Sequence, residues 1–257
     1  MRKGLQVLCV FLVFALFAGH AVMASQDETV RYIVRFKADN IKLQGATRNQ
    51  VISALQQNLR NNLKSVTKVI KSPTSSNMNP LWIANAFALD ASEDEIARIA
   101  KLPAVAEVYR NKYQVYIDKD IDKKVVKADP AVIQWGVQKV RAPEVWQQFR
   151  IDGAGVVVGI IDTGIDGSHP AFEGKILKFK DFTVDQSETP TDTQGHGTHV
   201  AGTVAGSEGV GVAPGARLII GRVFDTSGGT TEEVLLAGMQ WMLDPDGIAE
   251  TNDGPRL

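Results

Sequence analysis

Two residues of this sequence have the type and the setting for acid–base chemistry. Asp162 directly follows the apolar run 156–161 and precedes Thr163-Gly164. A carboxylate there leaves the carboxyl end of a parallel strand, where open α/β folds build ligand sites, although an Asp that caps a turn is the alternative. His196 stands between two glycines before a run of small residues typical of a closely packed helix. The positive end of that helix would favour a neutral ring able to act as a general base, whereas a buried core histidine is the alternative.

A metal site is a competing interpretation of the same region. His196 and His199 are three positions apart and Asp192 precedes them, but no H-E-x-x-H helix or nearby cysteine completes a ligand set. The acidic segments 181–192 and 244–253 could bind a hard cation such as calcium through oxygen atoms. Solvated loops are the favoured interpretation of both segments, so we assign no metal ligand from the sequence.

The elements that must position Asp162 and His196 are those of an α/β layer architecture. The run 156–161 is apolar on both faces, as expected of a central parallel strand covered by helices, and 217–223 is a second such strand. A capping pattern at 230–233 opens a helix that continues through Trp241 and Met242. The alternation of strand and helix predicts a parallel sheet between helices.

A separate block precedes this region. Residues 30–36 alternate as a strand, and Val51, Leu55, Leu59 and Leu63 form the stripe of an amphipathic helix. The run 81–89 predicts a second strand, and Ser92-Glu93-Asp94-Glu95 is a capping box that opens a helix stopped by Pro103. Extended chain at 105–109 and 113–117 closes the block. The β-α-β-α-β order predicts a small α+β domain of the split βαβ type.

Composition and the N-terminus limit the class of protein. The 257 residues carry 28 basic and 29 acidic side chains, and this balance argues against a nucleic-acid partner. Arg2 and Lys3, the apolar run 5–18 and small residues up to Ala24 predict a cleaved secretory signal rather than a membrane anchor. The only cysteine, Cys9, lies in that leader. The charged segment 118–124 predicts an exposed linker.

Two contiguous blocks give the sequence a family resemblance. Residues 158–166 and 196–203 resemble the aspartate and histidine blocks of subtilisin-like serine proteases, in the Asp-before-His order of that family. The resemblance implies that Asp162 orients the imidazole and that His196 moves the proton of a serine nucleophile. Residues 210–216 also resemble the family. It further implies that Ser227, Gly228, Gly229 and Thr230 pair with extended substrate, although an ordinary turn is the alternative.

The resemblance divides the chain into four parts. We expect a signal peptide at 1–24, an inhibitor-type propeptide domain of ferredoxin-like α+β fold at 28–118, a linker with the maturation site at 119–133, and a partial subtilisin-like catalytic domain at 134–257. The expected fold class is α/β, the N-terminal half of a subtilisin-like parallel-sheet domain behind that propeptide. The expected protein is a secreted monomer that binds a protein or peptide substrate, with the propeptide bound in cis, no nucleic acid, and no membrane after signal cleavage.

One part of the family pattern does not occur in these residues. No Gly-Thr-Ser block follows the histidine block, and the later serines Ser207 and Ser227 lie in Gly-flanked polar loops. We therefore expect a truncated sequence that is inactive alone. Calcium is possible by resemblance, but Ala171 follows His169-Pro170 where the family often has a ligand Asp. The alternative is a non-catalytic protease inhibitor or folding assistant formed by the first block.

Overall fold

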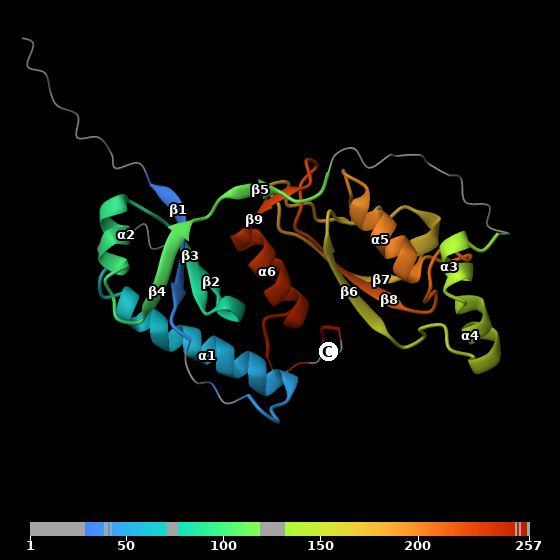
Figure 1. The fold of residues 1–257 in the computed structure, drawn as a ribbon, viewed down its shortest axis with the longest axis horizontal. Helices are drawn as coiled ribbons and strands as arrows, with labels where there is room; N and C mark the ends of the chain where they lie inside the picture. The colour runs from blue at the N-terminus through green and yellow to red at the C-terminus, as the bar shows by residue number, and fades with distance from the viewer. Residues whose placement is uncertain are drawn as a thin grey trace, which may run out of the picture.

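The computed structural model describes residues 29–38, 41, 43–70, 77–118, 132–249, 251 and 253–255. The predicted leader 1–24, with Cys9, and residues 119–131 of the predicted linker lie outside these described residues. Within the described part of the chain, every helix is too short or too polar to cross a bilayer. Two units lie on either side of helix α6 (Glu232–Leu243), as Figure 1 shows.

The N-terminal unit is a four-stranded antiparallel sheet with two helices on one face. Its elements are β1 (Val30–Phe36), α1 (Arg48–Val66), β2 (Asn79–Leu81), β3 (Ala86–Ala91), α2 (Glu93–Ile99) and β4 (Val105–Arg110). The strand order is β2-β3-β1-β4. The predicted alternation of β1 is confirmed, because Tyr32, Val34 and Phe36 face a core with Leu59 of α1 and Ile99 of α2. The elements observed are thus β-α-β-β-α-β.

The prediction of one strand over 81–89 is wrong. A 3₁₀ turn, η2 (Trp82–Ala84), and the left-handed residue Asn85 (φ 49°) divide this run. The chain therefore reverses, and β2 pairs antiparallel with β3. Apolar residues on both sides of the turn hide the break in the sequence pattern, since Leu81 and Ala86 are both buried.

Helix capping follows the sequence closely. The predicted capping box is present, because the Ser92 side chain accepts from the Glu95 amide and the Glu95 side chain accepts from the Ser92 amide. Thr47 and Gln50 form a second capping box at the start of α1. Both boxes satisfy amides that the first turn of a helix leaves without partners.

The parallel sheet of the C-terminal unit has the strand order β6-β8-β7. Its strands are β6 (Val157–Asp162), β7 (Ile176–Asp181) and β8 (Arg217–Arg222). In the sheet that the described residues form, β8 pairs with both β6 and β7, and β6 has one strand neighbour. β7 has no counterpart among the sequence predictions.

Helices cover both faces of this parallel sheet. Helix α5 (His196–Ala205) packs on one face through Ala201 and Ala205, which contact Ile160 and Leu218 in one core. On the other face lies α6, where an added Cβ at Gly238 would meet Val223 and Ile161. The remaining elements are α3 (Trp135–Lys139), α4 (Ala142–Phe149), η3 (Pro170–Phe172) and β9 (Gly229–Thr231).

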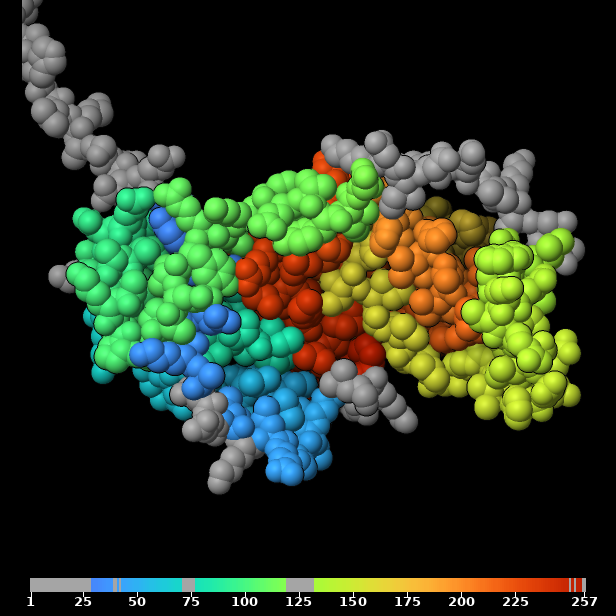
Figure 2. All heavy atoms as spheres, in the orientation of Figure 1, coloured from blue at the N-terminus to red at the C-terminus, as the bar shows by residue number. Residues whose placement is uncertain are grey.

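The same helix α6 also contacts the N-terminal sheet. Leu236 packs against a second core of that unit, formed by Ile33, Leu81, Ala86 and Ala88 on the face that α1 and α2 leave open. Strand β5 (Tyr113–Val115) then crosses the boundary and pairs antiparallel with β9. The expectation that residues 113–117 complete the first block is therefore wrong, since their strand partner belongs to the C-terminal unit. Figure 2 shows this green segment lying over the red surface.

Candidate active site

The carboxylate of Asp162 and the imidazole of His196 are in direct contact. His196 Nδ1 lies 2.8 Å from Oδ1 and 3.0 Å from Oδ2 of Asp162. Asp162 is the last residue of β6 and His196 the first of α5, so the contact forms where the parallel strand ends. The predicted convergence of these side chains is confirmed. The Asp162 side chain is 10% exposed and that of His196 35% exposed, so the imidazole can be reached from solvent.

Three side chains fix the first turn of α5 and with it the position of His196. The His196 amide donates to Gln194 Oε1 at 2.8 Å, the next amide donates to Thr163 Oγ1 at 2.8 Å, and the Thr198 amide donates to Asp192 Oδ2 at 2.9 Å. These contacts satisfy the amides that begin a helix. Burial raises the pKa of Asp192, but hydrogen bonds from Thr198 and from backbone amides outweigh it, and the net pKa is lowered.

Glycines allow the strand end and the helix start to approach closely. Gly164 has φ +111°, and a Cβ there would lie 2.0 Å from the Thr191 carbonyl oxygen. A Cβ at Gly197 would lie 2.2 Å from the Gly164 carbonyl oxygen. Larger residues at either position would separate Asp162 from His196, because the obstructing atoms are backbone.

The geometry defines what the pair can do chemically. A carboxylate only accepts hydrogen bonds, so the Nδ1–H of His196 donates to Asp162 and the Nε2 lone pair is left to accept a proton. The Thr163 amide donates to Asp162 Oδ1 at 2.7 Å, which fixes the orientation of the carboxylate. A neutral imidazole held in one tautomer is suited to general-base catalysis.

An extended segment of the chain already pairs with the predicted substrate strand. Tyr113, Gln114 and Val115 face Thr231, Thr230 and Gly229 in antiparallel register. The amides of Tyr116 and Ile117 both donate to the Gly228 carbonyl, at 3.0 and 3.1 Å. Of the predicted residues, Gly228, Gly229 and Thr230 thus pair with extended chain. Ser227 lies in the preceding turn, where its amide donates to Asp225.

Gln194 links this segment to the histidine. Its Oε1 accepts from the His196 amide, and its Nε2 donates to the Asp118 carbonyl at 3.3 Å. Gln194 is 5% exposed, so the amide is held rigidly between the two partners. Gln194 was not among the predicted site residues, although its place beside the histidine block was a signal. The segment 113–118 therefore ends beside His196.

A buried arginine supports the loops around the pair. Arg222, 1% exposed, lies opposite Asp162 in the β6–β8 register and donates to Asp181 at 2.8 Å and to Asp185 at 2.7 Å. It also donates to Thr193 Oγ1 at 3.0 Å. Burial raises the pKa of Asp181, but bonds from Ser187, Thr183 and Arg222 leave it lowered. No sequence pattern marked Arg222, which ends a strand that also begins with an arginine, Arg217.

The metal interpretation of His196, His199 and Asp192 is not supported by the geometry. Both oxygens of Asp192 accept amides at the start of α5, and His196 Nδ1 is taken by Asp162. Among the described residues, Asp244, Asp246 and Asp253 do lie within 4.8 Å of one another. Lys178 pairs with Asp253 at 2.5 Å and Gln56 donates to Asp244, so we assign no cation to this cluster.

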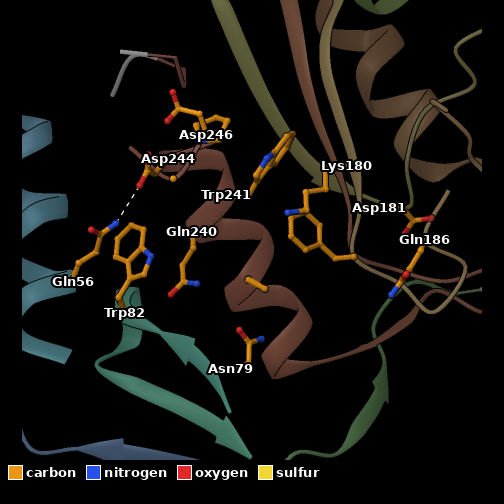
Figure 3. Close-up of a pocket in the computed structure, with 14 residues that line it drawn as sticks. Gln56, Asn79, Trp82, Lys180, Asp181, Gln186, Gln240, Trp241, Asp244 and Asp246 are labelled. Atoms are coloured by element: carbon orange, nitrogen blue, oxygen red, sulfur yellow. Dashed lines mark hydrogen bonds between the residues drawn. The ribbon is translucent and has the colours of Figure 1, made fainter. Parts of the chain in front are cut away.

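A cavity of about 750 Å³ lies away from the Asp162–His196 pair, between the N-terminal unit and α6. Trp82 and Trp241 stand on its walls, as Figure 3 shows, and Gln56 donates across it to Asp244. Neither Asp162 nor His196 lines it. Its walls come from both units, and we treat it as part of the boundary between them.

Comparison with known proteins finds that the C-terminal unit is similar to a family of proteases. Residues 153–255 match the Subtilase family, Peptidase_S8. Bacillopeptidase F of Bacillus subtilis (strain 168) is 28% identical over 91% of this chain and 18% of that protein. Intracellular serine protease of Paenibacillus polymyxa is 38% identical over 52% of this chain and 44% of that protein. Thermitase of Thermoactinomyces vulgaris is 39% identical over 43% of this chain and 40% of that protein.

The chain spans less than half the length of these curated relatives. A solved structure described as a cold adapted subtilisin-like serine proteinase is 40% identical to this chain. That match covers 36% of this chain and 33% of the solved chain, with a TM-score of 0.34.

Proposed function

We propose that this chain, which carries a subtilase-family domain over residues 153–255, belongs to the secreted precursor of a subtilisin-like serine endopeptidase. The proposal assigns 1–24 to a signal peptide, 28–118 to a ferredoxin-like propeptide domain, 119–133 to a linker with the maturation site, and 134–257 to part of the catalytic domain. The contact between Asp162 and His196 beside a strand that binds extended peptide is the observation that carries it.

In this proposal His196 is the general base and Asp162 orients it. Nε2 takes the proton of a serine hydroxyl as the oxygen attacks the scissile carbonyl, and later returns it to the leaving amine. Asp162 holds the required tautomer and stabilises the imidazolium formed between the two steps. The residues available here include no serine in a Gly-Thr-Ser block, so we predict that these 257 residues alone do not turn over substrate.

The proposal also gives the N-terminal unit an inhibitory role in cis. Residues 113–117 use the hydrogen bonds of Gly228 to Thr231 that an extended protein substrate would use. A substrate strand cannot pair with β9 while β5 does. The β-α-β-β-α-β order and the docking of the open sheet face on α6 support a propeptide of this type.

The test is hydrolysis of casein by the protein expressed from its complete coding sequence. We expect activity, a loss of about 10⁴-fold in kcat for Asp162→Asn, and a loss at least as large for His196→Ala. The matched control is His199→Ala, an exposed histidine one turn further along α5, which should retain near full activity. A complete protein that hydrolyses no peptide, or that loses as much activity in the control, would contradict the proposal.

A covalent probe separates the complete protein from this chain. A fluorophosphonate reacts with an activated serine, so it should label the complete protein and leave the 257-residue chain unlabelled. Labelling of the short chain would show that Ser207 or another serine present here acts as a nucleophile. The prediction of inactivity would then be wrong.

A further inference from the structure

The segment that pairs with β9 is held by one side-chain contact as well as by backbone bonds. The Tyr113 hydroxyl donates to Asp225 Oδ2 at 2.8 Å. The other oxygen of Asp225 accepts from the amides of Ser227 and Gly229, at 2.8 and 3.1 Å. The turn before β9 therefore fixes the carboxylate with one oxygen directed at the paired segment.

Gly229 provides the room that this contact needs. A Cβ at Gly229 would lie 1.9 Å from the Tyr113 hydroxyl oxygen and 2.1 Å from the ring carbon that bears it. The phenol thus crosses the strand directly over the glycine backbone. A side chain at position 229 would displace the phenol. Gly229 and the Asp225 carboxylate together therefore form a small receptor for the side chain of residue 113, which pairs with Thr231.

The electrostatics of this receptor favour a donor. Burial raises the pKa of Asp225, but hydrogen bonds from Tyr113 and from the Gly229 and Ser227 amides, with the nearby charge of Arg222, leave it lowered. An ionised carboxylate accepts hydrogen bonds, attracts a cation and repels an anion. A phenol, ammonium or guanidinium at the place of Tyr113 therefore fits, and a carboxylate does not.

We propose that Asp225 is a specificity-determining residue of the cleft, which selects peptides carrying a hydrogen-bond donor, Tyr, Lys or Arg, at the position opposite Thr231. This inference rests on the proposed function, because it treats the strand that binds residues 113–117 as the strand that binds substrate. A protein substrate that pairs with β9 in the same register places one side chain over Gly229 and against Asp225.

Residue 113 of the chain itself occupies this receptor, so the proposal can be tested by substituting residue 113. The measurement is hydrogen exchange of the Tyr116 and Ile117 amides in the full 257-residue chain, because both donate to Gly228 only while the segment is paired. We expect exchange ~3-fold faster in Tyr113→Phe, ~10-fold faster in Tyr113→Glu, and no faster in Tyr113→Lys. The control is Tyr116→Phe, whose lost hydroxyl contacts Gln114 within the segment, and it should exchange as the parent does.

A second variant should remove most of the preference against a carboxylate at position 113. Asp225→Asn keeps the oxygen that accepts from the turn amides and replaces the other acceptor by an NH₂ donor. In that background, the ~10-fold penalty of Tyr113→Glu should fall to ~2-fold or less, because the like-charge repulsion is gone. Exchange rates that do not depend on residue 113, or a Tyr113→Glu penalty that stays near ~10-fold in the Asp225→Asn background, would overturn the inference. Failure of the complete protein to hydrolyse casein would instead overturn the proposed function and leave these rates unaffected.

Discussion

Replacing Glu233 should release the N-terminal unit from α6. Its carboxylate accepts from Arg31 at 2.8 Å (Nε) and 2.5 Å (Nη2), from Asn79 at 2.9 Å and from Asn111 at 3.2 Å. All three partners belong to the N-terminal unit or to the segment that leaves it. The Glu233 side chain is only 14% exposed and that of Arg31 26% exposed, so the pair is largely removed from water.

The magnitude follows from what remains after truncation. Removing one partner of a fully buried ion pair costs about 3–5 kcal/mol, because the other charge stays buried without compensation. Arg31 keeps Asp90 at 3.3 Å and the Asn77 carbonyl at 2.6 Å, and water reaches part of it. We therefore expect Glu233→Ala to lower the free energy of unfolding by about 2–3 kcal/mol.

The assay is urea unfolding of the full chain, followed by tryptophan fluorescence. Trp82 lies in the N-terminal unit, and Trp135, Trp146 and Trp241 lie in the C-terminal unit. The matched control is Glu232→Ala, which removes the neighbouring exposed carboxylate and one bond from the Tyr109 hydroxyl. That variant should lose at most about 1 kcal/mol. A Glu233→Ala loss of unfolding free energy no larger than that of the control would refute the reasoning. So would losses of unfolding free energy from Arg31→Met and Glu233→Gln that simply add in the double variant.

Three further changes test the supports of the candidate site by their effect on the urea unfolding of the full chain. Gly164→Ala should cost at least about 2 kcal/mol, because φ is +111° and the new Cβ would meet the Thr191 carbonyl; wild-type stability would contradict this. Arg222→Met should cost about 3 kcal/mol by leaving Asp181 buried without its cation, and an unchanged midpoint would show the pair to be dispensable. Asp192→Ala should cost about 1–2 kcal/mol through the lost helix contacts. Since the pKa of Asp192 is lowered on folding, its contribution is present above pH about 4 and is lost as the pH falls further, so the parent and variant curves should converge in acid.

The Asp162–His196 contact was predictable because each residue lies in a contiguous motif at the end of a recognisable element. The capping box at Ser92 and the start of α6 were predictable for the same reason, since caps act within three or four positions. Glu233 was not, because its partner Arg31 lies 202 positions away and neither residue stands in a local pattern. Strand β7 was missed because its lysines at 178 and 180 interrupt the apolar run that marked the other parallel strands.

The strand partners of β6 and of residues 113–117 could not be predicted from composition. The sequence of β6 is as apolar as that of β8, yet the partners that a strand finds depend on chain order and helix placement. Similarly, residues 113–117 look like one more strand of the first block, and only the docking of that block on α6 brings them to β9. Local pattern thus predicted that these strands exist but not which strands they join.

The docking of the N-terminal unit on α6 and the pairing of residues 113–117 with β9 are coupled, because the residues that make the two contacts are close in sequence. β9 ends at Thr231 and α6 begins at Glu232, so Glu233 lies two residues from the strand that binds residues 113–115. On the other side, only Asn111 and Lys112 separate β4 from β5. A segment tethered this closely has an effective concentration of about 1 mM or more, so a free peptide at micromolar concentration must bind about 10³-fold more tightly to displace it. Loss of the Glu233 contacts weakens the docking that holds the segment beside β9 and leaves its own bonds to residues 228–231 and Asp225 in place, so docking on α6 and pairing with β9 together determine the occupancy of β9 by residues 113–117.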